Sequence, residues 1–264
     1  MSMEQEKRIL FDHAAEAYDT FRPSYPERAV DCIISYARVK RSSRLLEVGA
    51  GPGKASVLFA ARGLTIDCLE PGENLCRLAR KNLAAWPRVN VIPSTFEDFE
   101  GPAEGYDLVY AAQSFHWIDH TLRFRKAQRL LSRHGSLAII YNYSPAPEKG
   151  LSQDLHQAIH ASSGGAMKSG NYEDEIARWT AQIKADDLFF DLQVERFRWR
   201  SEYTAQRYAG LLSTYSTFLA LDTATQERIL AAVADVFAAY RQPLVRDMIC
   251  VVFLARKNRR KASA

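Results

Sequence analysis

The feature that most constrains this chain is a glycine-rich turn that directly follows a short apolar segment. Residues 45–48 are apolar apart from Glu47, and glycine then occupies three alternate positions, Gly49, Gly51 and Gly53. Glycine has no Cβ atom, so the backbone can turn sharply there and a ligand can approach it closely. A helical pattern begins at the next residue, and the start of a helix offers free N–H groups and the positive end of its dipole. The segment therefore predicts a nucleotide- or nucleoside-binding turn.

Short apolar runs alternate with helical patterns through the first half of the chain. The predicted strands are 45–48, 66–69, 89–92, 108–112 and 137–141, and the predicted helices are 55–62, 72–85 and 122–131. Strands that are apolar on both faces and separated by helices are typical of a parallel sheet covered on both sides. We therefore predict an α/β fold with a Rossmann-like, doubly wound sheet.

The pattern changes after Asn142, where Pro145 and Pro147 interrupt the chain. Helices are predicted at 151–162, 172–188, 204–212 and 223–240, and strands at 194–199 and 248–254. The two late strands would complete a seven-stranded sheet that is mostly parallel, with the last strand antiparallel. We expect one domain over 1–264, made of an N-terminal helical lid (1–40), a ligand-binding core (41–142), a helical cap insertion (143–190) and a C-terminal part (191–256) that completes the sheet and roofs the pocket.

Composition narrows the class of protein. Hydrophobic residues make up 47% of the 264 residues, which suits a globular domain with a full core. The net charge is +4, and much of the basic excess lies in the segment 256–261, which we interpret as a solvated end. The four cysteines lack metal-site spacing, and Cys68 and Cys250 stand in apolar runs that predict buried thiols. No metal site, signal peptide or membrane span is indicated, so we expect a cytoplasmic protein.

Two acidic residues indicate which ligand the glycine turn binds. Glu47 would repel a pyrophosphate and would suit a cationic ligand. Glu70 ends the next predicted strand, where a carboxylate can accept hydrogen bonds from both ribose hydroxyls; the alternative is an acid that only begins the following helix. Lys54 stands where a dinucleotide-binding turn has its last glycine, which disfavours a nicotinamide-dependent dehydrogenase.

The segment from Glu47 to Gly53, together with Glu70, resembles the class I S-adenosylmethionine-dependent methyltransferases. The similarity extends through residues 94–98, 106–117 and 130–137, and so over nearly the whole chain. It implies S-adenosyl-L-methionine as the cofactor. Residues 11–15 and 18–26, the His116-Trp117 pair and residues 212–216 are also similar to small-molecule methyltransferases related to trans-aconitate methyltransferase.

The resemblance implies a set of site residues. Cofactor contacts are expected from Tyr18, Arg22, Glu47, Gly49, Ala50, Gly51, Gly53, Glu70, Pro71, Thr95, Phe96, Glu97, Ala112 and Gln113, and substrate contacts from Tyr25, Ser114, Trp117 and Tyr215. The family often has an acid at the position of Thr95, so Glu97 or a backbone carbonyl is expected to bind the adenine amino group. His116 follows a predicted strand and is the candidate general base; the alternative is a histidine that packs beside Trp117 under a lid.

The predicted activity is methylation of a small-molecule oxygen or nitrogen nucleophile, with carboxylates among the candidates. A carboxylate needs no base, whereas a phenol, alcohol or amine would use one. Arg198, Arg200 and Arg207 would bind an acidic substrate, or form a solvated face. Nucleic acid and membrane partners are not expected, and the protein is expected to be a monomer or homodimer. Methylation of RNA or protein, and a catalytically silent S-adenosylmethionine-binding protein, stay open as alternatives.

Overall fold

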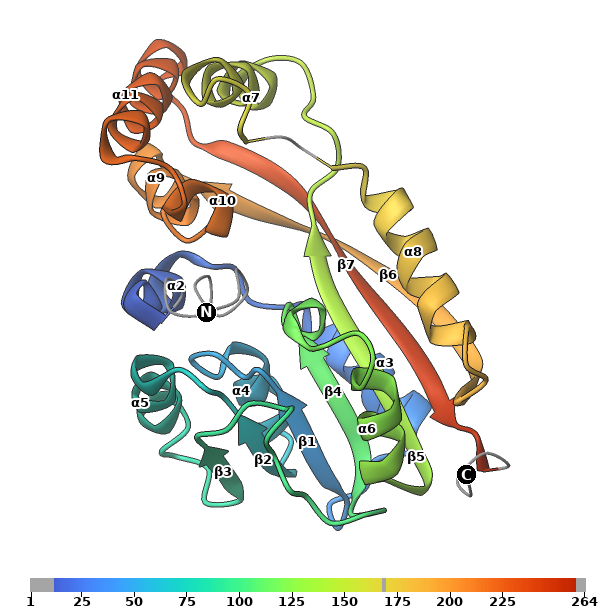
Figure 1. Ribbon diagram of the computed structural model, residues 1–264. Helices are drawn as coiled ribbons and strands as arrows, with labels where there is room; N and C mark the ends of the chain where they lie inside the picture. Colours follow the sequence, from blue (N-terminus) through green and yellow to red (C-terminus); the bar gives the residue numbers. More distant parts are fainter. Residues whose placement is uncertain (1–11, 168–169, 260–264) are drawn as a thin grey trace. The chain divides into compact units, whose positions relative to one another are not determined.

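The computed structural model describes residues 12–167 and 170–259 and contains a seven-stranded sheet (Figure 1). The strands are β1 (Arg44–Val48), β2 (Thr65–Leu69), β3 (Val89–Ile92), β4 (Tyr106–Ala112), β5 (Leu131–Tyr143), β6 (Phe189–Tyr203) and β7 (Leu244–Lys257). Their order in the sheet is β3-β2-β1-β4-β5-β7-β6. Neighbours from β3 to β5 pair in parallel, and the last strands are antiparallel. The predicted doubly wound, seven-stranded fold is confirmed.

The helices lie close to their predicted positions. They are α2 (Ala15–Phe21), α3 (Glu27–Ala37), α4 (Lys54–Ala60), α5 (Glu73–Asn82), α6 (Arg123–Leu130), α7 (Leu151–Ser162), α8 (Tyr172–Lys184), α9 (Ala205–Leu212), α10 (Ser216–Leu219) and α11 (Thr223–Tyr240), with a 3₁₀ turn η1 (Phe115–Trp117). Capping fixes several ends: α11 begins behind Asp222, whose carboxylate accepts the Thr225 N–H at 2.9 Å. No helix in the described part of the chain is long and apolar enough to cross a membrane.

The described residues form two compact units. The core unit comprises the described residues of 24–142, 173–197 and 250–264, and the helical unit those of 1–23, 143–172 and 198–249. The change of pattern at Asn142 thus coincides with a boundary between units. The predicted cap insertion does not coincide with a unit, since α7 belongs to the helical unit and α8 to the core unit.

In the core unit, β1 lies between β2 and β4, at the point where the strand order reverses. Its Leu45 and Leu46 are fully buried, as are Leu108 and Val109 of β4. Helix α4 packs against β2, α5 against β3 and α6 against β4. Figure 1 shows α6 in front of the strands and α3 behind them. Ligands of such sheets bind at the carboxyl ends of the strands beside this reversal, so the glycine turn stands on a rigid base. Cys68 and Cys250 are buried free thiols, as predicted.

The helical unit has its own apolar core. Helix α11 packs against α7 and α9, and α2 packs against α9. Buried residues of this core include Leu155 and Ile159 of α7, Leu211 of α9 and Ile229 and Val233 of α11. Apolar positions three and four residues apart place these side chains on one face of each helix. The helical unit is therefore held together by packing between helices rather than by strand pairing alone.

Candidate functional site

The glycine turn joins β1 to α4 in the core unit with three residues in the left-handed region of φ. The φ angles are 67° at Gly49, 57° at Gly51 and 89° at Gly53. A Cβ atom on Gly49 would lie 2.6 Å from the Cβ of Ser114, which follows β4. The Ser114 hydroxyl also donates a hydrogen bond to the carbonyl oxygen of Val48. The conformation and this close approach both require glycine at position 49.

The middle of the turn has the form that a ligand needs. A Cβ atom on Gly51 would meet no atom of the described residues within 4 Å. The Gly51 N–H donates to Oε2 of Glu70 at 2.7 Å, and the Gly72 N–H donates to Oε1 at 2.9 Å. Glu70 is 6% exposed, and these two hydrogen bonds tie the turn to the end of β2. A carboxylate has about four acceptor sites, and one at the end of this strand can accept hydrogen bonds from ribose hydroxyls. The predicted contact of Glu70 with a nucleoside fits this geometry.

Glu47 lies beneath the turn rather than in solvent. Its side chain is 1% exposed, and its Oε2 accepts hydrogen bonds from the hydroxyls of Ser56 and of Tyr110, the latter at 2.8 Å. Burial raises the pKa of Glu47 to about 7, and the two hydrogen bonds oppose that shift. The structure gives the carboxylate partners inside the core unit. Its contact with a cationic ligand stays a prediction.

Other predicted cofactor residues surround the same ends of β1, β2 and β3. Ala50 is buried, and its N–H donates to the carbonyl of Leu69 at 2.9 Å. Pro71 is exposed at the end of β2. After β3, the Thr95 hydroxyl donates to Asp98 at 2.7 Å and accepts the Asp98 N–H, which fixes the loop.

The loop after β3 was predicted to flank the adenine. Phe96 is buried, and the ammonium of Lys126 lies 5.7 Å from its ring centroid. Oε1 of Glu97 accepts the Asp119 N–H at 3.3 Å. The acceptor that Glu97 was expected to offer to an adenine amino group is therefore partly engaged inside the core unit.

The exit of β4 holds the candidate base and its neighbours. Ala112 is buried, and the next residue, Gln113, has a φ of 60° and donates from Nε2 to the carbonyl of Asn142 at 3.0 Å. His116 is exposed, and its ring centroid lies 4.7 Å from that of the partly buried Trp117. Nδ1 of His116 lies 3.1 Å from the hydroxyl of Tyr141. That contact orients the imidazole ring beside the end of β4.

The sequence analysis missed three residues that shape this exit. The Tyr141 ring stacks on Trp179 of α8 with centroids 5.4 Å apart, and the guanidinium of Arg123 lies 4.7 Å from the Trp179 ring. Nη1 of Arg123 donates to the carbonyl of Phe115 at 3.3 Å, which anchors the 3₁₀ turn that carries His116. The rings of Phe115 and Trp179 also lie close, with centroids 6.0 Å apart, although the two residues are 64 positions apart (179 minus 115). No local pattern in the sequence therefore indicates these contacts.

The remaining predicted residues are divided between the units. Tyr25 lies in the core unit, between α2 and α3, and is partly buried. Tyr18, Arg22 and Tyr215 all lie in the helical unit, where the Arg22 guanidinium lies 5.3 Å from the ring of Tyr18 and 4.3 Å from that of Tyr215. Arg22 also donates to the hydroxyl of Thr214 at 2.7 Å. The structure thus brings these three predicted residues together.

The family match covers the same part of the core unit. Residues 46–139 run from β1 into β5 and match a protein family described as a methyltransferase domain. Over residues 46–139 the chain is similar to a methyltransferase domain, as predicted from the glycine turn and Glu70. Proteins of this fold family bind S-adenosylmethionine. The narrower relationship to trans-aconitate methyltransferase stays a prediction.

Curated relatives and solved structures are also similar to this chain. An uncharacterized methyltransferase of Mycobacterium tuberculosis is 30% identical over 138 residues, which cover 52% of this chain and 54% of that protein; the chain thus spans about half the length of that relative. A methyltransferase structure from Anaeromyxobacter dehalogenans, provisionally described as type II, has a TM-score of 0.69 at 21% identity and covers 89% of this chain and 98% of its own. A Haemonchus contortus phosphoethanolamine N-methyltransferase bound to S-adenosylhomocysteine has a TM-score of 0.53 at 17% identity, over 93% of this chain and 57% of its own.

Proposed function

We propose that this protein transfers a methyl group from S-adenosylmethionine to an oxygen or nitrogen nucleophile of a small molecule, carboxylates included. The observation that carries the proposal is the turn between β1 and α4. Gly51 presents open space to a ligand, and the carboxylate that bonds its N–H, Glu70, stands where ribose hydroxyls would need an acceptor. The methyltransferase match over residues 46–139 supports it.

The residues present fit the cofactor. The backbone of Gly49–Gly53 would lie against it, Glu70 would hold its ribose, and Thr95 and Phe96 would border its adenine. Bound S-adenosylmethionine supplies a methyl group on a positively charged sulfur, which is already a good leaving group. The protein therefore has to align the nucleophile and exclude water rather than activate the methyl donor.

His116 would act as the base for an acceptor that must lose a proton. Its exposed position after β4 lies at the carboxyl ends of the strands, where substrates of this fold class bind. The Tyr141 hydroxyl, 3.1 Å from Nδ1, would orient the imidazole for this proton transfer. An acceptor carboxylate would bypass this step, because it is ionised at neutral pH. Gln113, Ser114 and Trp117 border the same exit and are proposed to orient the acceptor.

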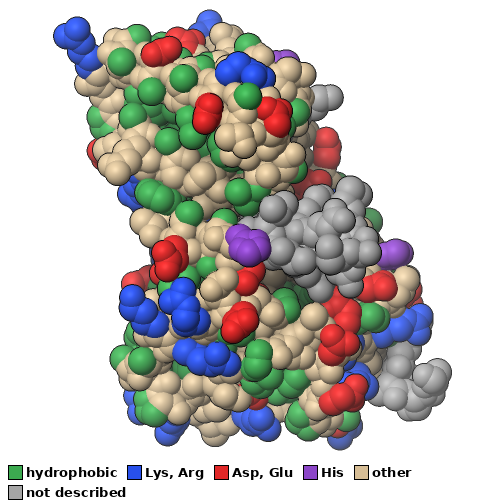
Figure 2. Space-filling model, turned by 60° about the vertical axis from the view of Figure 1, so that its left-hand side comes forward, with side chains coloured by type: hydrophobic (Ala, Val, Ile, Leu, Met, Phe, Trp, Pro, Cys, Tyr) green, Lys and Arg blue, Asp and Glu red, His purple; other side chains and the backbone are tan. Residues whose placement is uncertain are grey.

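A small acceptor suits the charge pattern of the surface. Basic, acidic and hydrophobic side chains are mixed over the face of the molecule shown in Figure 2. Proteins that grip RNA generally gather lysine and arginine into a patch or stripe. On the face shown in Figure 2, the mixed pattern supports a small-molecule acceptor over a polynucleotide.

Calorimetry tests the cofactor directly. We expect S-adenosylmethionine and S-adenosylhomocysteine to bind the full chain, and NAD not to bind. No heat of binding at millimolar S-adenosylmethionine, or preferred binding of NAD, would overturn the proposal. The silent alternative is tested by a methyl-transfer screen of carboxylic acids, phenols and amines.

The same screen separates the two roles of His116. For an alcohol, phenol or amine, His116→Ala is expected to lower kcat roughly 100-fold, as for loss of a general base. The rate should recover at high pH, where the acceptor ionises without help. A carboxylate acceptor should be methylated at the wild-type rate. A uniform loss for all acceptors at all pH values would instead indicate a packing role.

A further inference from the structure

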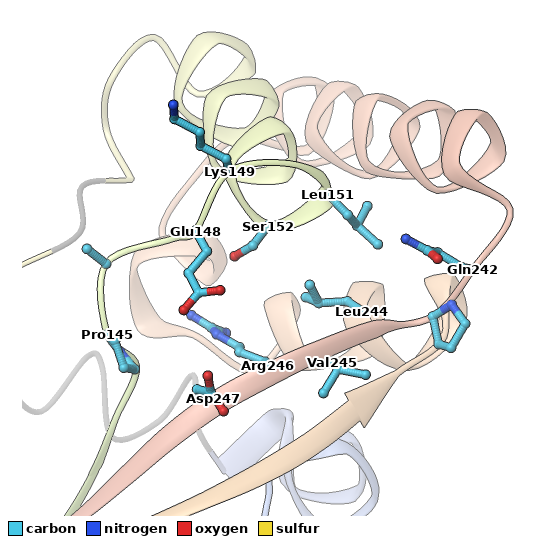
Figure 3. A pocket seen from close by; sticks show the side chains of 12 residues that line it. Pro145, Glu148, Lys149, Leu151, Ser152, Gln242, Leu244, Val245, Arg246 and Asp247 are labelled. Carbon is cyan, nitrogen blue, oxygen red and sulfur yellow. The ribbon is translucent and has the colours of Figure 1, made fainter.

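The helical unit contains an arginine whose charge has no carboxylate partner. Arg246 lies in β7 between the buried Leu244 and Met248, and alternate residues of a strand share a face. Figure 3 shows its side chain pointing from β7 toward Glu148 at the start of α7, while Val245 points the opposite way. Among the described residues, no carboxylate oxygen lies within ion-pair distance of Arg246, whereas its neighbour Asp247 pairs with Arg200 at 2.9 Å.

Besides Glu148, three tyrosines lie near Arg246. Burial acts to lower the pKa of Arg246, but nearby Tyr215, Tyr208 and Tyr203 raise it, and the net shift is upward. A tyrosine carries no charge at neutral pH. These three side chains therefore do not cancel the charge of the guanidinium.

Two further polar groups lie in this part of the helical unit. The Tyr203 side chain is fully buried, and its hydroxyl has no hydrogen-bond partner among the described residues. Burying a hydroxyl without a hydrogen-bond partner costs about 1–3 kcal/mol. Unpaired buried hydroxyls are therefore rare in folded proteins. A second cation stands beside the cluster, since the guanidinium of Arg22 lies 4.3 Å from the ring centroid of Tyr215.

A cavity of about 320 Å³ reaches Arg246. It is lined by the segment around Pro145, the start of α7 and the first residues of β7, all of which belong to the helical unit. Ser152 contributes a hydroxyl to its wall. Lys149 also lines it but points away from Arg246 in Figure 3. Because Asp247 is paired with Arg200, Glu148 remains as the carboxylate that faces Arg246 across this space.

We propose that Arg246 binds the oxyanion of a small ligand, a carboxylate or a phosphate group, in this cavity. A guanidinium offers a planar pair of N–H donors that matches both groups, and Ser152 adds a hydroxyl donor from the opposite wall. Glu148 opposes the anion by like charge and so limits the affinity. The site lies in the helical unit and does not depend on the methyl-transfer proposal.

Titration calorimetry of the full chain with inorganic phosphate and with malonate, at low ionic strength and against sodium chloride, tests the site. We expect saturable binding of at least one anion, and which one binds identifies the ligand class. Arg246→Gln should weaken binding at least about tenfold, as for loss of a charged hydrogen bond. Arg228→Gln removes the same charge from an exposed position on α11 and should change affinity less than about twofold.

A milder variant keeps the test decisive if Arg246→Gln does not fold. Glu148→Gln removes the opposing charge and should tighten anion binding about threefold or more. Absence of binding by both anions, equal affinity of wild type and Arg246→Gln, or weaker anion binding by Glu148→Gln would each overturn the proposal.

Discussion

The core unit and the helical unit treat their buried charges in opposite ways. In the core unit, the carboxylates of Glu47 and Glu70 are buried and satisfied by hydroxyl and backbone donors of the same unit. In the helical unit, Arg22 lies against the rings of Tyr18 and Tyr215, and neither Arg22 nor Arg246 forms an ion pair with a carboxylate of the described residues. The core unit thus uses its buried carboxylates to shape a backbone turn, whereas the two arginines of the helical unit stay without an ion-pair partner among the described residues.

The largest expected effect concerns the pH dependence of stability through Glu47. Its pKa is about 7 in the folded protein and near 4.5 when unfolded. The folded state therefore holds the proton more tightly, so stability is fully present below the unfolded pKa and is lost as the pH rises through about 7. The gap between the wild type and Glu47→Gln in free energy of unfolding should change by about 3 kcal/mol between pH 4 and 8. Urea denaturation across that range measures it, and parallel curves would contradict the prediction.

Glu70→Gln tests the other buried carboxylate of the core unit. Replacing a charged acceptor by a neutral one should weaken S-adenosylmethionine binding by about 10- to 100-fold. The melting temperature should fall only slightly, since an amide oxygen can still accept the Gly51 N–H. Glu73→Gln, an exposed acid three residues further along the chain, is the matched control and should bind like the wild type. Unchanged affinity of Glu70→Gln would remove Glu70 from the ribose.

Arg22→Gln tests the helical unit in the same way. The variant loses hydrogen bonds to the hydroxyl and carbonyl oxygens of Thr214 and the contact with the Tyr215 ring. We expect the free energy of unfolding to fall by about 1–2 kcal/mol, measured by urea denaturation. A stability equal to that of the wild type would show that these contacts do not hold α2 to the unit. A simultaneous loss of S-adenosylmethionine affinity would support the predicted role of Arg22 in cofactor binding.

Tyr141→Phe should have the smallest effect. The ring still stacks on Trp179, but Nδ1 of His116 loses its 3.1 Å partner. For an acceptor that needs a base, we expect kcat to fall about threefold and the pH profile to shift, because the imidazole loses one hydrogen bond of about 1 kcal/mol. An unchanged pH profile would show that Tyr141 does not position His116.

Most of the core unit could be predicted because its signals are local. Apolar runs such as Leu45–Val48 and Ile66–Leu69 fix strands, and positive φ at three alternate glycines fixes the turn. The partners of Glu47 could not be predicted, because Ser56 and Tyr110 come from a helix and a distant strand. The strands β6 and β7 are also longer than predicted, since half-exposed residues of β6 lack an apolar run.

The sequence alone predicted the fold class and the glycine turn, because each rests on residues close together along the chain. Its resemblance to methyltransferases predicted the methyl donor. The tertiary structure alone decided which charges are satisfied. Arg22 donates a hydrogen bond to Thr214, which is 192 residues away along the chain. Arg246 lies near three tyrosines that belong to β6, α9 and the segment before α10. Such contacts follow from how helices pack onto strands, and no spacing along the chain encodes them. The methyl donor can therefore be proposed from the sequence, whereas the proposed anion site depends on how the helical unit folds.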